Sequence, residues 1–175
     1  NGLVGSEQAV SAAWAQVENT YQRRADLIPN LVATVKGSAA FEQETLQAVV
    51  EARSRVGQVS GQAIQEILHN PEKFAQFQQA QDGLSSALSR LLVVVERYPE
   101  LKSTAAFADL MTQLEGTENR ITVERMRFNE VAREYNTRLA KFPTNLFDRI
   151  LGWHFENRPY FAAQAGAATA PKVEF

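Results

Sequence analysis

Apolar side chains recur along most of this chain at alternating steps of three and four residues, the spacing that gathers them on one face of an α-helix. The first such series contains a single charged member and comprises Val10, Trp14, Val17, Tyr21, Arg24, Ile28, Leu31 and Val35. Gly37 and Ser38 then supply a helix stop and a new start. The pattern predicts one long helix that buries this face and ends near residue 36.

Three further helices follow from the same spacing. The second begins near Phe41 and is expected to end near Gly57, and residues 57–70 are predicted as a loop with a short helical piece. Asn70 before Pro71 is a favourable helix start, because Asn caps free backbone N–H groups and Pro fits the first turn. This third helix ends before Pro99.

The fourth helix is the longest, from about Thr104 to Lys141. The one β-branched cluster, residues 91–95, lies inside helical periodicity, so no strand is expected. Together the patterns predict an all-α, up-and-down bundle of long antiparallel helices of the four-helix type over residues 1–143, followed by an extended aromatic C-terminal tail, residues 144–175.

Three polar residues interrupt the apolar faces: Arg24, Gln81 and Glu124. Each lies near the middle of its helix, so we expect a buried polar layer, with Arg24 and Glu124 paired between antiparallel helices. One interpretation is a ligand site or a proton-handling pair. The other is a device that sets helix register, as polar core residues do in coiled coils.

Pro29 falls on the outward side of the first helix. Its ring removes the N–H that would bond the carbonyl of Ala25, which bends a helix without necessarily ending it, and Asn30 is placed to satisfy part of the freed backbone. Alternatively, the bend presents a partner surface made of Arg23, Asp26, Pro29 and Asn30.

The C-terminal segment mixes aromatic and basic residues, with Trp153, Tyr160 and Phe161 as candidate membrane or subunit contacts. In an up-and-down bundle the end of the fourth helix lies beside the start of the first. If a membrane anchor precedes residue 1, this segment lies at the membrane face, where such residues are favoured. The alternatives are a strap packed on the bundle itself and docking of residues 171–175 onto a neighbouring subunit.

Charge and composition exclude several classes of protein. The 175 residues are 45% hydrophobic and 22% charged, with 18 Lys plus Arg against 20 Asp plus Glu. A net charge of −2 leaves no broad basic footprint for nucleic acid. The chain has no cysteine, and its longest apolar run, residues 91–95, falls far short of a membrane span.

Catalytic constellations are missing from the sequence. The only histidines, His69 and His154, stand in no Glu-x-x-His pair, so a ferritin-like di-metal site cannot be assembled. Glu115 and Glu118 are interpreted as a solvated face or as partners of Arg120 and Arg125. With no glycine-rich phosphate loop either, we expect no cofactor, no metal and no enzymatic activity.

Long runs of the sequence resemble the LemA family in order and spacing. They are AWAQVENTYQRRADLIPNLVATVKG, ETLQAVVEARSRVG, ALSRLLVVVERYPELK, QLEGTENRITVER, FNEVAREYNTRLAKFP and RPYF. The resemblance implies a helical-bundle domain of the bacterial cell envelope. It also implies that a hydrophobic segment or lipoprotein-type signal upstream of residue 1 anchors the domain to the membrane, and we expect it on the periplasmic or extracytoplasmic side.

Two functions remain open. The first is a non-enzymatic, membrane-anchored scaffold or membrane-organising protein that forms homo-oligomers, with Gly116 permitting close approach of another helix or marking an oligomer contact. The second is an adaptor that binds another envelope protein, such as a protease.

Overall fold

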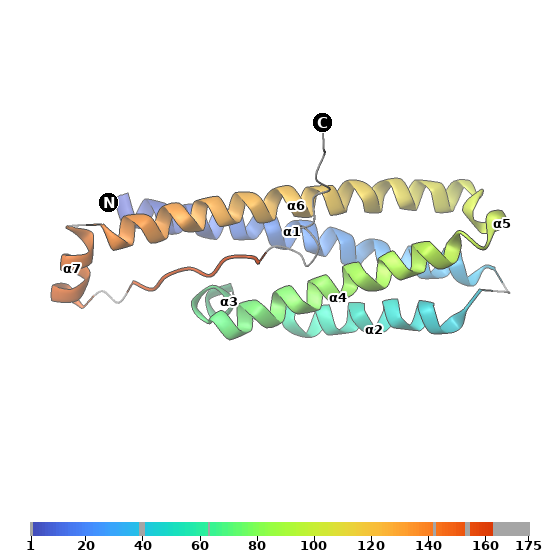
Figure 1. Ribbon diagram of the computed structural model, residues 1–175, viewed down its shortest axis with the longest axis horizontal. Helices are drawn as coiled ribbons and strands as arrows, with labels where there is room; N and C mark the ends of the chain where they lie inside the picture. The colour runs from blue at the N-terminus through green and yellow to red at the C-terminus, as the bar shows by residue number, and fades with distance from the viewer. Residues whose placement is uncertain (1, 39–40, 63, 142, 153–154, 163–175) are drawn as a thin grey trace, which may run out of the picture.

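Four long helices build the molecule: α1 (Gly2–Lys36), α2 (Gln43–Ser60), α4 (Pro71–Val95) and α6 (Ala105–Ala140) (Figure 1). Three short helices join or follow them: α3 (Ile64–His69), α5 (Pro99–Lys102) and α7 (Thr144–Leu151). The computed structural model describes residues 2–38, 41–62, 64–141, 143–152 and 155–162. These residues form no strand, and the predicted all-α bundle is confirmed.

The two longest helices, α1 and α6, pack antiparallel along nearly their whole length (Figure 1). Arg138 near the end of α6 donates to the carbonyl of Gly2, and Glu118 lies beside Arg24 further along. The shorter helices α2 and α4 form a second pair that covers one half of the first. One half of the α1–α6 pair therefore packs against both α2 and α4, and the other half lacks this full cover.

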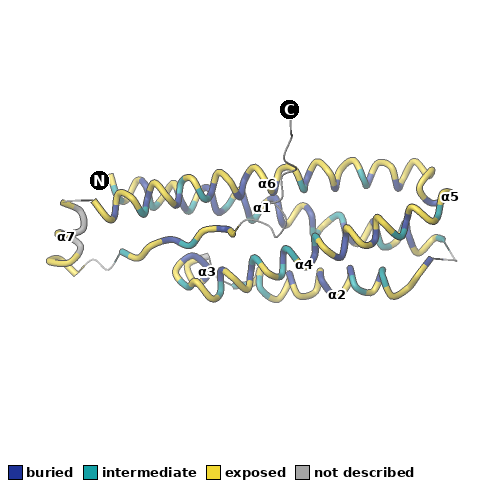
Figure 2. Tube along the Cα trace, viewed as in Figure 1, coloured by how far each residue is buried: buried dark blue, intermediate teal, exposed yellow. Residues whose placement is uncertain are grey.

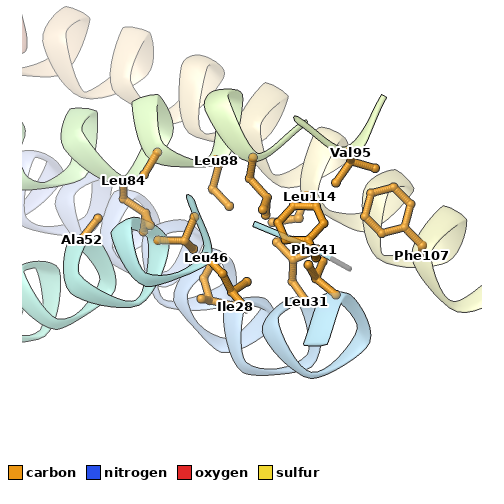
Figure 3. Packing of buried hydrophobic residues seen from close by; sticks show 14 of the residues in the cluster. Ile28, Leu31, Phe41, Leu46, Ala52, Leu84, Leu88, Val95, Phe107 and Leu114 are labelled. Carbon is orange, nitrogen blue, oxygen red and sulfur yellow. The ribbon is translucent and has the colours of Figure 1, made fainter. Parts of the chain in front are cut away.

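Two apolar clusters fill the bundle. The α2-side core lies among α1, α2, α4 and α6, and Figure 3 shows part of it; its fully buried members include Leu31, Val35, Val49, Leu84 and Leu91. The strap-side core, in the other half, includes Val10, Trp14, Phe77, Phe128 and Tyr135. Buried residues alternate with exposed ones along every long helix (Figure 2), as an amphipathic pattern requires.

The helix starts follow ordinary capping chemistry. The side chain of Asn70 accepts hydrogen bonds from the backbone N–H groups of Glu72 and Lys73, with Pro71 in the first turn. Thr104 accepts from Phe107 at the start of α6. The expected end of the second helix near Gly57 is wrong, because α2 continues to Ser60.

Residues 144–151 form helix α7, so the predicted tail is not extended throughout. Residues 155–162, here called the strap, run in extended form along α6 and the start of α4 (Figure 1). The expected close helix approach at Gly116 is also wrong, since a Cβ atom there would meet no heavy atom within 4 Å.

Helix α1 runs through Pro29 without interruption. The carbonyl of Ala25, which loses its helical partner to the proline ring, accepts a hydrogen bond of 3.1 Å from Nε of Arg53 on α2. Asn30 does not fill this role; its own carbonyl accepts from the Thr34 hydroxyl. The bond from Arg53 ties α2 to α1 at the turn where Pro29 frees a backbone acceptor.

Replacing Pro29 by Ala should raise the free energy of unfolding by about 1 to 3 kcal/mol, because alanine restores a helical N–H. Replacing Arg53 by Met should cost about 1 kcal/mol in the natural chain, and much less in the Pro29→Ala background, where the Ala25 carbonyl has its own partner. Urea unfolding of the four proteins measures the coupling. Additive effects would contradict the assigned role of Arg53.

Candidate functional site

The most polar place inside the bundle surrounds Arg24, which is 0% exposed. Its Nη1 donates to the Ser85 hydroxyl at 2.5 Å and to the Glu118 carboxylate at 2.8 Å. Its Nη2 donates to the backbone and side-chain oxygens of Gln81 at 2.9 and 2.7 Å. The guanidinium also lies 5.2 Å from the centre of the Tyr21 ring. Helices α1, α4 and α6 thus meet at one buried charge.

The expected pair between Arg24 and Glu124 is wrong. Glu124 is buried, but its carboxylate accepts from Nε of Arg120 at 2.9 Å on the same helix. The antiparallel register sets Glu118 opposite Arg24, and Glu124 lies about 9 Å further along the helix axis, at 1.5 Å per residue. Arg24 and Gln81 do lie together, whereas Glu124 belongs to a different contact.

A second ion pair extends the polar layer across the seam between α4 and α6. Nη1 of Arg125 donates to the Asp82 carboxylate at 2.9 Å, and Arg125 is 7% exposed. Its guanidinium lies 4.6 Å from the centre of the Phe161 ring. The sequence interpretation that linked Arg120 and Arg125 to Glu115 and Glu118 is therefore wrong, because each arginine has another carboxylate.

The strap is held by three side-chain amides, each of which binds the backbone of one strap residue twice. Asn136 accepts from the N–H and donates to the carbonyl of Arg158, at 2.8 and 2.9 Å. Asn129 does the same for Phe161, and Gln78 for Ala162. Asn129 and Asn136 stand two helical turns apart, about 10.5 Å, which matches three residues of extended chain at about 3.3 Å each.

Side chains of the strap complete the bundle. Phe161 is 5% exposed and lies against Trp14, Phe74 and Phe128, with ring centres 4.8 to 5.9 Å apart. Arg158 is 4% exposed and binds the Glu7 carboxylate at 2.7 Å. The strap therefore supplies apolar and charged contacts that α1, α4 and α6 lack in this half.

The predicted membrane or subunit contacts divide into three outcomes. Phe161 is buried in the chain's own core, so its predicted external role is wrong and the strap interpretation holds for it. Tyr160 is 46% exposed, and its hydroxyl accepts from Asn136. Trp153 lies outside the described residues.

The candidate partner surface is open to solvent. Arg23, Asp26, Pro29 and Asn30 are all exposed on α1, and the Asp26 carboxylate accepts from Gln22. Arg23 lines a polar cleft of about 490 Å³ together with Arg120 and Gly116, whereas Asp26, Pro29 and Asn30 are not among its lining residues. The four residues remain a surface on which a partner could dock.

Burial shifts two pKa values beside the polar layer. It raises the pKa of the Glu18 carboxyl above its usual range, and the nearby Trp14 indole offsets only part of this rise. Burial likewise raises the pKa of Tyr21 to about 12, against the opposing charges of Arg125 and Arg24. Burial thus acts in the same direction on both groups, toward the uncharged form.

Side chains that could hold a metal ion do not cluster in the described part of the chain. No cluster of three or more His, Asp or Glu side chains suitable for a metal ion occurs there. His69 ends α3, where burial and then the charge of Arg158 lower its pKa; His154 lies outside the described residues. Among the helices described, none is both long and apolar enough to cross a membrane.

Sequence reasoning missed the residues that hold the strap and the true partner of Arg24. From the sequence alone, the amides of Asn129, Asn136 and Gln78 cannot be distinguished from ordinary solvent-exposed side chains on the polar faces of their helices. The seven-residue spacing of the two asparagines was the available signal. Glu118 could be found only by knowing the register between α1 and α6.

An elongated antiparallel bundle, closed along one half by an extended strap and tied by buried charges, defines the class of this protein as a helical-bundle domain. The LemA family's sequence profile matches residues 13–175, and the chain belongs to the LemA family.

Individual relatives, each under 30% identical to this chain, agree with this assignment. The chain is similar to magnetosome protein MamQ 2 of Paramagnetospirillum magneticum, at 28% identity over 97% of this chain and 66% of the relative. It is similar to magnetosome protein MamQ of Magnetospirillum gryphiswaldense, at 29% over 92% and 64%. Protein LemA of Metamycoplasma hominis matches at 21% over 83% and 61%. The chain thus spans just under two-thirds of the length of these relatives.

Neutralising Glu118 should destabilise the bundle more than neutralising Glu124. Glu118→Gln leaves the Arg24 guanidinium buried without its counter-charge, a cost of about 3 kcal/mol. Glu124→Gln removes a pair whose arginine is 67% exposed, so its cost should stay below about 1 kcal/mol. Urea unfolding at neutral pH compares the two isosteric variants, and the reverse order would refute the pairing described above.

Proposed function

We propose that this chain is the extramembrane domain of a non-enzymatic, membrane-anchored protein of the bacterial cell envelope, which organises membrane by associating with itself. Membership of the LemA family and the similarity to proteins named as magnetosome proteins support a membrane setting. We place the domain on the periplasmic or extracytoplasmic side. The buried charges described above each have an ion-pair partner, and we therefore assign the function to contacts made by the domain's surface.

The observation that carries the membrane part of the proposal is the exposed apolar face of α7. Leu146, Ile150 and Leu151 are 44%, 68% and 52% exposed, and Arg149 is exposed between them. Helix α7 lies at the end of the bundle where α1 begins (Figure 1). Apolar side chains next to a basic one on a short helix suit the boundary between lipid headgroups and acyl chains.

Vesicle flotation tests this contact. The chain should float with vesicles of phosphatidylcholine and phosphatidylglycerol, and a triple variant with Leu146, Ile150 and Leu151 replaced by Ser should bind at least about tenfold more weakly, because its apolar contacts are lost. A control replaces Val50 and Val93, which are exposed on α2 and α4, by Ser. Equal loss in both variants, or no flotation of the natural chain, would refute the role of α7.

Self-association is supported by exposed apolar residues on α6. Val123 and Met126 are 57% and 68% exposed and stand three residues apart, so they share one helix face. Exposing these two side chains to water is unfavourable, and the same face of a second copy would cover them.

Sedimentation velocity over a range of concentrations measures the assembly. The natural chain should form dimers or larger species, and replacing Val123 and Met126 by Gln should weaken their formation by about tenfold. The α7 triple variant serves as the control and should assemble as the natural chain does. A chain that stays monomeric at all concentrations would remove self-association from the proposal.

The second candidate is an adaptor for another envelope protein, and the full exposure of Arg23, Asp26, Pro29 and Asn30 favours it. The two functions differ in stoichiometry. A scaffold forms large homo-oligomers, whereas an adaptor stays small alone and changes size only with its partner. Cross-linking in native membranes separates them, because links to one foreign chain around α1 would identify an adaptor.

A further inference from the structure

The seam between α4 and α6 is covered in one half of the bundle and open in the other. In the strap half, Phe161 lies over the seam and the Gln78 and Asn129 amides bind the strap backbone on either side of it. Beyond the Asp82–Arg125 ion pair, the same seam opens into a cleft of about 540 Å³ with Leu31 of α1 as its floor. No described residue plays the part of the strap there.

The cleft has the dimensions of a short peptide. Its lining runs from Ser85 on α4 to Glu96, the residue after that helix, and from Phe107 to Glu118 on α6. Each stretch covers about 16 Å at 1.5 Å per residue, which equals about five residues of extended chain. A volume of 540 Å³ lies within the range of specific binding clefts.

The walls of the cleft are apolar. Leu88 and Leu92 of α4 face Met111 and Leu114 of α6. Figure 3 shows Leu31, Leu88 and Leu114, which belong to three helices, gathered in the α2-side core beneath it. Leu92 is 38% exposed, so part of this wall is left to solvent. An occupant with a bulky apolar side chain would cover it.

The rim carries an excess of negative charge. Glu96, Glu115 and Glu118 border the cleft, with Lys102 as the one basic lining residue among those described. Lys102 is paired with Glu96 at 2.6 Å, and Glu118 with Arg24. Glu115 is exposed and makes no hydrogen bond or ion pair within the described part of the chain. This rim favours a cationic group and repels the anionic headgroups of lipids and fatty acids.

We propose that the cleft binds an extended segment of a partner protein that presents a bulky apolar side chain beside a lysine or arginine. The strap shows how this seam accepts extended chain, with an aromatic ring between the helices and the backbone along their surface. The occupant would continue that arrangement into the open half, with its basic group at Glu115. This goes beyond the proposed function and depends on neither membrane contact nor self-association.

Fluorescence anisotropy with the full chain tests the proposal. The probe is a labelled peptide, Lys-Leu-Phe-Leu-Lys, and the control peptide is Glu-Leu-Phe-Leu-Glu. The basic peptide should bind at least about tenfold more tightly, and raising the salt concentration should weaken it. Leu92→Arg and Glu115→Lys should each reduce its affinity by about tenfold or more. Val93→Arg, next to Leu92 but outside the cleft, and Glu130→Lys, also exposed on α6, should bind as the natural chain does.

Three results would overturn the proposal. Equal affinity for both peptides would remove the role of the acidic rim, and equal effects of the cleft variants and their controls would remove the cleft. Displacement of the bound peptide by low concentrations of palmitate would assign the cleft to lipid. A chain shortened after Ala162 that binds at least about tenfold more tightly than the full chain would mean that residues 163–175 compete for the cleft, which would assign it to this chain and not to a partner.

Discussion

The rest of the structure depends on the burial of one guanidinium group. A charge withdrawn fully from water must be met by hydrogen bonds and a counter-charge, and Arg24 finds them on two other helices at once, in Gln81, Ser85 and Glu118. These partners are available in only one alignment of α1, α4 and α6. A slip of one helical turn would leave the charge among leucines and phenylalanines. Apolar contacts supply most of the burial, and Arg24 selects which of the similar apolar registers is adopted.

The polar layer around Arg24 separates the α2-side core from the strap-side core, and a different element covers each of them. Three long helices leave one side of an apolar face uncovered, so a fourth element is needed. On one side α2 provides it, held to α1 by the Arg53 bond to the carbonyl that Pro29 frees. On the other side α2 has ended and the strap takes its place, with Phe161 among three aromatic rings. An extended chain cannot satisfy its own backbone groups as a helix does, and the paired amides of Asn129, Asn136 and Gln78 perform that task.

The helices could be predicted from the sequence because their periodicity is a local property. Asn70 and Thr104 cap helices within a residue or two of the expected starts, and Val10 to Val35 form one buried face as predicted. The pairing of Arg24 with Glu118 could not be predicted, since register depends on how loops and side chains from distant segments fit together. The strap was one of the alternatives for the C-terminal segment, and the sequence could not decide between it and a membrane contact for a related reason. Its aromatic and basic residues suit a membrane face as well as a protein core, and the choice rests on whether an apolar gap exists for Phe161.

Arg24, Glu124, Arg125 and Arg158 each have an ion-pair partner, and the fold sets the surfaces that could meet a membrane or a partner apart. Helix α7 lies beyond the last turn of α6. The open cleft lies around Leu114 and Glu118, which are in the first half of α6. The distance from the end of α6 to Glu118 is about 33 Å along the helix axis, at 1.5 Å per residue. A chain held to a membrane through α7 would therefore carry the cleft well clear of the lipid headgroups when the bundle stands upright. The same rigid helices that bury Arg24 would keep that separation constant, so contact at one end and recognition in the other half need not compete for the same residues.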